Sequence, residues 1–466
     1  MFGQLSNIFG RRWPFIISTA TFTLGSGICG GSTNISMLIA GRIIQGIGAS
    51  GINVIIEIII CDLVPLRERG NYLAAIFGVV ALGTALGPLF GGLIVQNISW
   101  RWVFYITLPV GGVALLLLLL FLKVRYKKDD NLATSLGRID WTGNIIFIGS
   151  ISSVLIALSW AGAVYPWSSY RVIVPLVIGM LGLVGFLVFE GSRFALQAMM
   201  PLHLMSNRTS ATAYVLTLLH SIVTMWALYF LPVYFQGVLG SSPEYSGEQL
   251  LPTILILIPF AAVGGMVMSK TGRYRPIQHV GFALMLIGMG LFSLLDEKSS
   301  TGAWVGFQII ASAGAGLIIS TVLPTVLAPL SDADTALATA TWAFCRSFGM
   351  TWGTAIAGAV FNNRFDQLVS RITDPTIAAQ VSGGNAYQFA TKSFLDSLST
   401  NTRTQFISVV NDSLRRTWQV SIAFAALGFL LVIVEKEIPL RKDLETNEYG
   451  MVDKKSKGVL STPSPV

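Results

Sequence analysis

Twelve long apolar stretches determine what this chain can fold into. Each is about 20 residues long, which is the length that an α-helix needs to cross the hydrocarbon core of a bilayer. Because 53% of the 466 residues are hydrophobic and only 12% are charged, so many stretches predict an all-α membrane protein that crosses the bilayer repeatedly. The stretches are residues 13–33, 37–60, 71–95, 103–122, 142–161, 172–190, 210–236, 249–268, 277–295, 303–328, 337–361 and 418–435.

Positive charge is distributed unevenly among the connections between these stretches. If residues 1–12 are cytoplasmic, the short connections on the opposite side hold only Arg101, Arg171 and Lys298, and six more Lys and Arg lie in the long connection 362–417. Cytoplasmic loops retain Lys and Arg, so the sequence predicts a multi-pass protein of the cell membrane with both termini in the cytoplasm. The net charge of +8 then reflects topology, and no nucleic-acid binding is expected.

An internal repeat indicates two related halves. The segment GQLSNIFGRR at residues 3–12 returns in outline as GMVMSKTGRYR at residues 265–275, and in both an arginine follows two glycines seven residues apart. The next apolar stretches also resemble each other, with RIIQGIGAS at 42–50 and QIIASAGAG at 308–316. Two similarities in the same order predict a duplicated six-helix bundle with parallel repeats.

The repeat also divides the chain into regions. In the second half two apolar stretches precede the basic turn, whereas in the first half none does, so we expect a larger transporter that lacks its first two spans. The expected regions are an N-terminal bundle with four visible spans at 1–128, two linking spans with a cytoplasmic loop at 129–208, a C-terminal bundle with a long extracellular loop 362–417 at 209–437, and a disordered cytoplasmic tail at 438–466.

Several motifs together resemble the major facilitator superfamily. GQLSNIFGRR is similar to its cytoplasmic signature, GRIIQGIGASG to its fourth-helix motif and LGTALGPLFGG to its antiporter motif. SWRWVFYITLP and RIDWTGN resemble the fourteen-helix branch that exports drugs and fungal metabolites in exchange for protons. The resemblance implies two pseudo-symmetric helical bundles joined by two extra helices. The chain departs from the pattern at Asn7, where the family often has an acidic residue, and at Thr107, where it often has asparagine.

Two sets of candidate residues come from these motifs. Gly83, Gly87 and Gly91 are spaced four apart and share one helix face, which Pro88 bends, so they predict a seam where another helix approaches closely. Static close packing explains the same spacing. The cytoplasmic turn contributes Gly3, Asn7, Gly10, Arg11 and Arg12.

Charged and titratable residues inside the apolar stretches are candidates for proton coupling or gating. Charges at membrane depth are costly and usually face a cavity or a partner. Arg42, Asn53 and Glu57 fall on one face of the second stretch, and Arg346 lies near the middle of the eleventh. His220 could titrate near physiological pH. Buried structural pairs are the alternative interpretation for Arg42, Glu57 and Arg346.

A substrate cavity and a glycan site complete the candidates. Aromatic and hydroxyl-bearing side chains form a stripe on 210–236, and a cavity lined by them would accept amphipathic molecules. Aromatic belts at the membrane interfaces and core packing explain many such stripes equally well. We assign Gln45, Asn53, Trp226 and Tyr229 to this cavity. Of the glycosylation sequons, only that at Asn411 is placed suitably in the predicted topology.

The sequence contains no nucleotide-binding GxxxxGK[ST], HExxH, GxSxG or paired CxxC motif. We therefore expect no enzyme, no metal and no cofactor, with a proton gradient as the energy source. The favoured function is a monomeric secondary active transporter that exports small organic molecules by alternating access and proton antiport. The alternatives are a proton-coupled importer of a nutrient or iron chelate and a truncated, non-transporting membrane protein.

Overall fold

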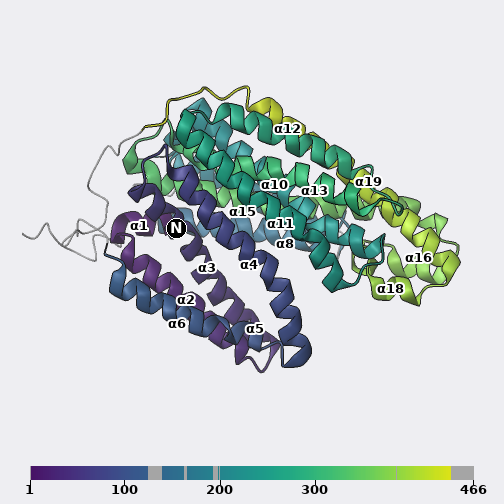
Figure 1. Ribbon diagram of the computed structural model, residues 1–466. Coiled ribbons are helices and arrows are strands. Elements are labelled where there is room, and N and C mark those ends of the chain that lie inside the picture. The colour runs from purple at the N-terminus through teal and green to yellow at the C-terminus, as the bar shows by residue number, and fades with distance from the viewer. Residues whose placement is uncertain are drawn as a thin grey trace, which may run out of the picture.

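The computed structural model describes residues 2–123, 139–161, 165–192, 198, 200–384 and 386–441. In α4 the side chains of residues 81, 85, 88, 89, 92, 93 and 95–97 are outside this description. The described chain is α-helical (Figure 1), as the apolar stretches predict. Most of the predicted tail, residues 442–466, lies outside the described residues.

The helices fall into an N-half, two linking helices and a C-half. The N-half comprises α1 (Phe2–Phe9), α2 (Arg12–Gly30), α3 (Ile35–Leu63), α4 (Arg69–Asn97), α5 (Trp102–Tyr105) and α6 (Thr107–Phe121). The linking helices are α8 (Trp141–Trp160) and α9 (Tyr170–Glu190). The C-half comprises η1 (Leu202–Met205), α10 (Arg208–Gly237), α11 (Pro243–Thr271), α12 (Arg275–Phe292), α13 (Thr301–Ile319), α14 (Val322–Leu327), η2 (Asp332–Asp334), α15 (Thr335–Leu368), η3 (Val369–Arg371), α16 (Pro375–Val381), α17 (Ala386–Phe389), α18 (Lys392–Ser397) and α19 (Thr400–Leu431).

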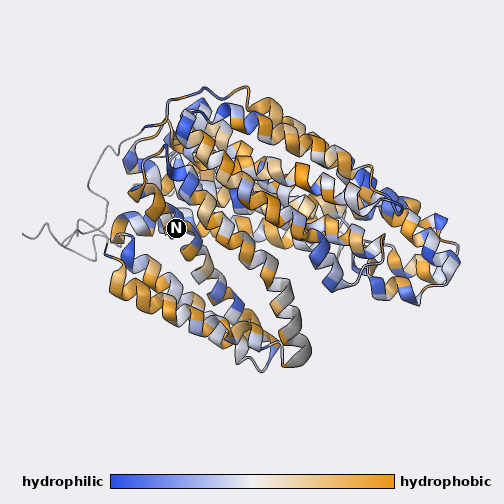
Figure 2. Cartoon of the chain, viewed as in Figure 1, coloured by the Kyte–Doolittle hydropathy of each residue, from blue (hydrophilic) through white to orange (hydrophobic). Residues whose placement is uncertain are grey.

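Every predicted apolar stretch coincides with a helix. Among the described residues, eight helical segments are long and apolar enough to cross a membrane, so the count of twelve spans stays a prediction. Large apolar side chains on α6, including Leu116, Leu119 and Leu120, are exposed. Figure 2 shows hydrophobic residues along most of α6 and along the long helices of the C-half. This pattern suits a lipid environment, because lipid tails are as apolar as these side chains.

Two segments differ from the sequence expectation. Residues 2–9 form the helix α1 instead of a turn. The expected loop 362–417 is mostly helical, because α15 continues to Leu368 and α19 begins at Thr400. The sequon residue Asn411 therefore lies inside α19, where its partner Ser413 is fully buried. A rigid helix with a buried sequon serine is a poor glycan acceptor, which makes Asn411 a weaker candidate than the sequence suggested.

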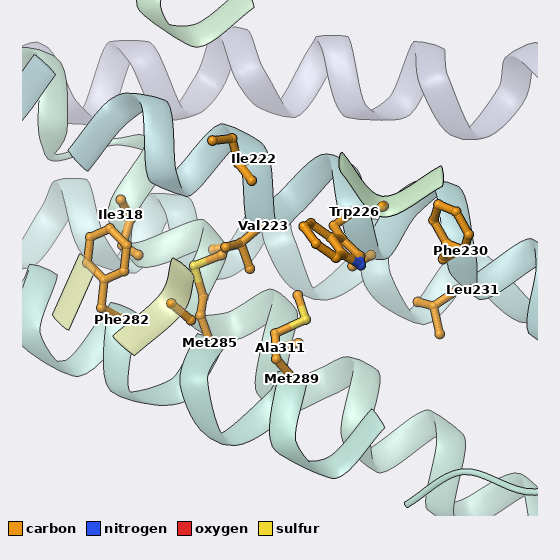
Figure 3. Packing of buried hydrophobic residues seen from close by; sticks show 14 of the residues in the cluster. Ile222, Val223, Trp226, Phe230, Leu231, Phe282, Met285, Met289, Ala311 and Ile318 are labelled. Atoms are coloured by element: carbon orange, nitrogen blue, oxygen red, sulfur yellow. The ribbon is translucent and has the colours of Figure 1, made fainter. Parts of the chain in front are cut away.

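The C-half has a continuous hydrophobic core. Side chains of α10, α12 and α13 meet there (Figure 3), among them Trp226, Met285 and Ala311. Close approach of α12 and α13 depends on small residues, since a Cβ on Gly288 would lie 2.6 Å from the Cβ of Ala311. Trp226 is fully buried in this core, so its ring packs inside the bundle in this conformation, and its place in a substrate cavity stays a prediction.

The internal repeat has a structural counterpart. Gly10 follows α1 with φ 75°, and Gly272 follows α11 with φ 72°. Each glycine turns the chain in the left-handed conformation that side chains disfavour, and an arginine and a new helix follow in both halves. The short α1 thus occupies the position that the last turns of α11 occupy in the C-half.

Candidate functional site

The two halves contact each other at the end of the molecule where α1 lies. A Cβ on Gly3 of α1 would lie 2.6 Å from the Cβ of Ala340 in α15. A Cβ on Gly265 of α11 would lie 2.7 Å from the backbone of Gly70 in α4. Figure 1 shows α4 beside α11, and α2, α3 and α6 grouped together. The equivalent positions of the repeat therefore form two equivalent contacts, α1 with α15 and α11 with α4.

Between these contacts lies a buried ion pair that joins the halves. Glu57 of α3 accepts a hydrogen bond from Arg346 of α15, with Oε1 2.8 Å from Nη2. The side chains of Glu57 and Arg346 are 2% and 13% exposed. The structure thus brings together two residues that the sequence indicated separately as coupling or gating candidates.

Two aromatic rings enclose the guanidinium of Arg346. Its Cζ lies 5.0 Å from the ring centroid of Phe77 in α4 and 4.6 Å from that of Trp342 in α15. Cations over aromatic faces gain about 0.5–2 kcal/mol, with the higher values at desolvated sites. Neither ring was predicted from the sequence. Trp342 could have been found, because it precedes Arg346 by four residues and so shares its helix face.

The surroundings make the ion pair sensitive to protonation of Glu57. A buried pair stays charged only if Coulomb attraction and hydrogen bonds offset desolvation. Oε2 of Glu57 is buried and has no hydrogen-bond partner among the described residues. A proton on Glu57 would remove the ionic attraction to Arg346, although the carbonyl oxygen of the neutral carboxyl group could still accept a hydrogen bond from the guanidinium. The pair can therefore act as a proton-controlled contact between the halves.

The predicted cytoplasmic turn is held by a second buried ion pair. Arg11 donates from Nε to Oδ2 of Asp62 at 2.7 Å and from Nη1 to the carbonyl of Ser6 at 2.9 Å. Arg12 donates to the carbonyl of Leu119 in α6 at 3.0 Å. Both side chains are buried, with Arg11 3% and Asp62 5% exposed. Asn7 lines a separate cavity of about 230 Å³ with Gln4 and Pro201.

Arg42 is not part of the ion pair. It precedes Glu57 on α3 by a rise of about 22 Å, and it is exposed. Its Nη1 donates to Oε1 of Gln45 at 2.7 Å, and Gln45 donates to Oγ of Ser26 at 2.8 Å. Asn53 is also exposed and donates to its own helix at the carbonyl of Ala49. These groups form a separate polar stripe toward the other end of α3.

The expected antiporter seam faces open space. Among the described residues, a Cβ on Gly83, Gly87 or Gly91 would meet no atom within 4 Å, and the side chain of Pro88 is outside the described set. No described helix therefore approaches these glycines closely in this conformation, and α4 makes a close contact at Gly70 instead. The helices of the two halves therefore meet near α1 and are apart along the second part of α4.

The two remaining candidates occupy different surroundings. His220 is buried in the C-half, with Nε2 3.1 Å from the carbonyl of Ala315 and 3.4 Å from Oγ1 of Thr224. This position joins α10 to α13 and lies within one bundle, which favours a structural role. Tyr229 is 41% exposed and stacks on Tyr387 of α17 with centroids 5.3 Å apart.

Comparison with known proteins agrees with this architecture. A family model described as Major Facilitator Superfamily matches residues 1–354. The MFS-type transporter pydD of an Acremonium species is 59% identical over 458 residues, which cover 98% of this chain and 80% of the relative. The MFS efflux transporter aclA of Aspergillus oryzae is 48% identical and the efflux pump FUS6 of Gibberella moniliformis 46% identical. These alignments cover 99% and 98% of this chain, and 83% and 81% of the relatives.

Solved structures share the fold at low sequence identity. The human organic anion transporter MFSD10 aligns with a TM-score of 0.57 and 13% identity over 92% of this chain and 79% of that chain. A bacterial homolog of the human lysosomal transporter Spinster, in an inward-facing and occupied conformation, aligns with a TM-score of 0.50 and 13% identity over 93% and 83%. At this identity the similarity speaks for the fold alone.

Proposed function

Because the chain belongs to the Major Facilitator Superfamily, we propose that it is a secondary active transporter that exports small organic molecules, such as secondary metabolites, toxins or drugs, in exchange for protons. Two relatives that align with almost all of this chain are named efflux transporters, and this supports the outward direction of transport. In this proposal the chain works as a monomer in the cell membrane, with the α1 end and both termini in the cytoplasm.

The observation that carries the proposal is the Glu57–Arg346 pair. It joins the halves at the α1 end, whereas Gly83, Gly87 and Gly91 face open space further along α4. With the α1 end in the cytoplasm, this arrangement is an outward-open state whose cytoplasmic side is closed. The ion pair is then part of the contact that must break before the cytoplasmic side opens.

The proposed cycle follows from the charge of Glu57. In the outward-open state a proton from outside neutralises Glu57 and removes its attraction to Arg346. The halves can then separate on the cytoplasmic side, where Glu57 loses the proton and the substrate binds. The return to the closed cytoplasmic contact restores the ion pair and carries the substrate outward. Proton entry and substrate exit are coupled because the pair forms in only one of the two states.

Vesicle transport with a gradient of either sign tests the proposal. Inverted vesicles containing the chain are given an acid interior and a mixture of fungal metabolites, and the lumenal content is measured by mass spectrometry. If the chain exports, metabolites should accumulate in the lumen, and a protonophore should abolish this accumulation. Glu57→Gln should lower the accumulation at least about tenfold, which corresponds to about 1.4 kcal/mol. Glu248→Gln is the matched control, because Glu248 is exposed at the start of α11. Uptake into right-side-out vesicles from acid medium would support an importer, and no flux in either direction would support a non-transporting protein.

A further inference from the structure

A polar groove runs between α15 and α19 at the ends of these helices that are far from α1. Its volume is about 620 Å³. Its lining on α15 includes Asn363, Arg364 and Gln367, and its lining on α19 includes Arg415 and Arg416. The spacing of three to four residues on each helix places these side chains on facing stripes. The lining of this groove includes neither residue of the Glu57–Arg346 pair and none of the cytoplasmic turn at residues 3–12.

The groove carries positive charge that the protein does not neutralise. Arg364, Arg415 and Arg416 form no salt bridge with a carboxylate in the described part of the chain. Asp412, the one acidic residue of the lining, pairs with Arg371 at 2.6 Å. This charge stands out, because a non-cytoplasmic side usually contains few arginines.

Glutamine side chains hold two of these arginines in place. Arg364 donates from Nη1 to Oε1 of Gln367 at 3.0 Å, and Arg416 from Nη1 to Oε1 of Gln419 at 3.4 Å. A guanidinium has five N–H donors, so each arginine keeps most of its donors for a ligand. Planar guanidinium groups of this kind match the oxygen pairs of a phosphate.

The depth of the groove matches a lipid headgroup. Arg364 lies about 44 Å along α15 from Thr335, and a bilayer with its headgroups is about 40–45 Å thick. Arg416 lies two residues before the apolar stretch of α19, which begins at 418. Val360 and Val420, which lie within the predicted apolar stretches 337–361 and 418–435, also line the groove. The lining is therefore cationic at headgroup level and becomes apolar where acyl chains would continue.

We propose that the groove between α15 and α19 binds the phosphate of an anionic phospholipid, with Arg364 and Arg416 as its ligands. The change from arginine to valine along the groove favours a lipid over a free phosphate ion, which has no apolar part. The proposal does not depend on transport, so it can fail or succeed independently of the function proposed above.

Native mass spectrometry of the purified full chain tests the proposal. The protein is titrated with phosphatidylserine and phosphatidylcholine, with and without inorganic phosphate as a competitor. We expect stronger binding of phosphatidylserine, and a loss of affinity of at least about tenfold in the double variant Arg364→Gln with Arg416→Gln, because two charge-assisted contacts are removed. The matched control is Lys392→Gln with Arg403→Gln, which removes the same charge at exposed sites outside the groove lining.

The outcomes separate the possible sources of the phosphate. An equal loss of phosphatidylserine affinity in the double variant and in the control would overturn the proposed site. The total positive charge of the protein would then explain the binding. Displacement of the lipid by inorganic phosphate at comparable affinity would overturn the lipid assignment. Both variants alter exposed or half-buried arginines and lysine, so we expect them to fold, and an unchanged unfolding temperature verifies this.

Discussion

The strongest prediction concerns the energy that the Glu57–Arg346 pair contributes to the closed contact of the halves. Arg346→Met leaves a carboxylate at 2% exposure without its cation. Breaking a buried pair from one side costs about 3–5 kcal/mol, and the lost contacts with the rings of Phe77 and Trp342 add about 0.5–2 kcal/mol. Proton uptake by Glu57 limits this cost, so we take about 3 kcal/mol as the working value.

This cost falls on one conformational state. The pair exists only where α3 meets α15, so its loss destabilises the closed contact and leaves the separated state unchanged. Because each 1.4 kcal/mol is a factor of ten, about 3 kcal/mol shifts the ratio of the two states about a hundredfold. Glu57→Gln should shift it less, since an amide can still accept a hydrogen bond from Arg346. The double variant should shift it less than the sum of the two single variants.

A cysteine at Ala336 reports the separation of the halves. Ala336 is buried where Gly3 of α1 packs on α15. After replacement of the native cysteines, the rate at which a membrane-impermeant maleimide labels Ala336→Cys measures how often this contact opens. We expect labelling to accelerate in the order native, Glu57→Gln, Arg346→Met. Equal rates in all variants, or strictly additive effects in the double variant, would refute the role of the pair.

Two further predictions address packing and stability. Gly265→Val should lower yield and transport because its side chain would enter the backbone of α4, whereas Gly290→Ala, which has open space around it, should match the native chain. Asp62→Asn removes the carboxylate that pairs with Nε of the buried Arg11, and we expect an unfolding temperature several degrees lower, from a cost of about 3 kcal/mol; an unchanged value would contradict a stabilising role of the pair.

Both contacts between the halves use equivalent parts of the repeat. Gly3 lies against α15, and Gly265 lies against α4. The ion pair, in contrast, has no charged counterpart in the repeat, because α13, the helix equivalent to α3, contains no charged residue. Symmetric contacts of this kind allow the halves to move as bodies, and in the function proposed above protonation of Glu57 controls which state they adopt.

The sequence alone determined the class of the protein. Helices of membrane-spanning length follow from local hydropathy. The comparisons confirm the predicted membership of the major facilitator superfamily, and with it the prediction of a transporter and not an enzyme. Glu57 and Arg346 could be selected as individual residues, because a charge at membrane depth requires a compensating environment wherever its partner lies. The positive-φ turns at Gly10 and Gly272 were likewise visible as spaced glycines.

The tertiary structure decided which of these residues meet. Nothing in local spacing pairs Glu57 with Arg346, or Arg11 with Asp62, since each pair joins residues of different helices. The same limit applies to Trp226. The aromatic stripe on its helix fits a cavity lining and a packed core equally well, and only the neighbouring helices show which of the two it forms. Hydropathy and periodicity report the face of one helix, whereas ion pairs, cores and grooves depend on how two or more helices pack.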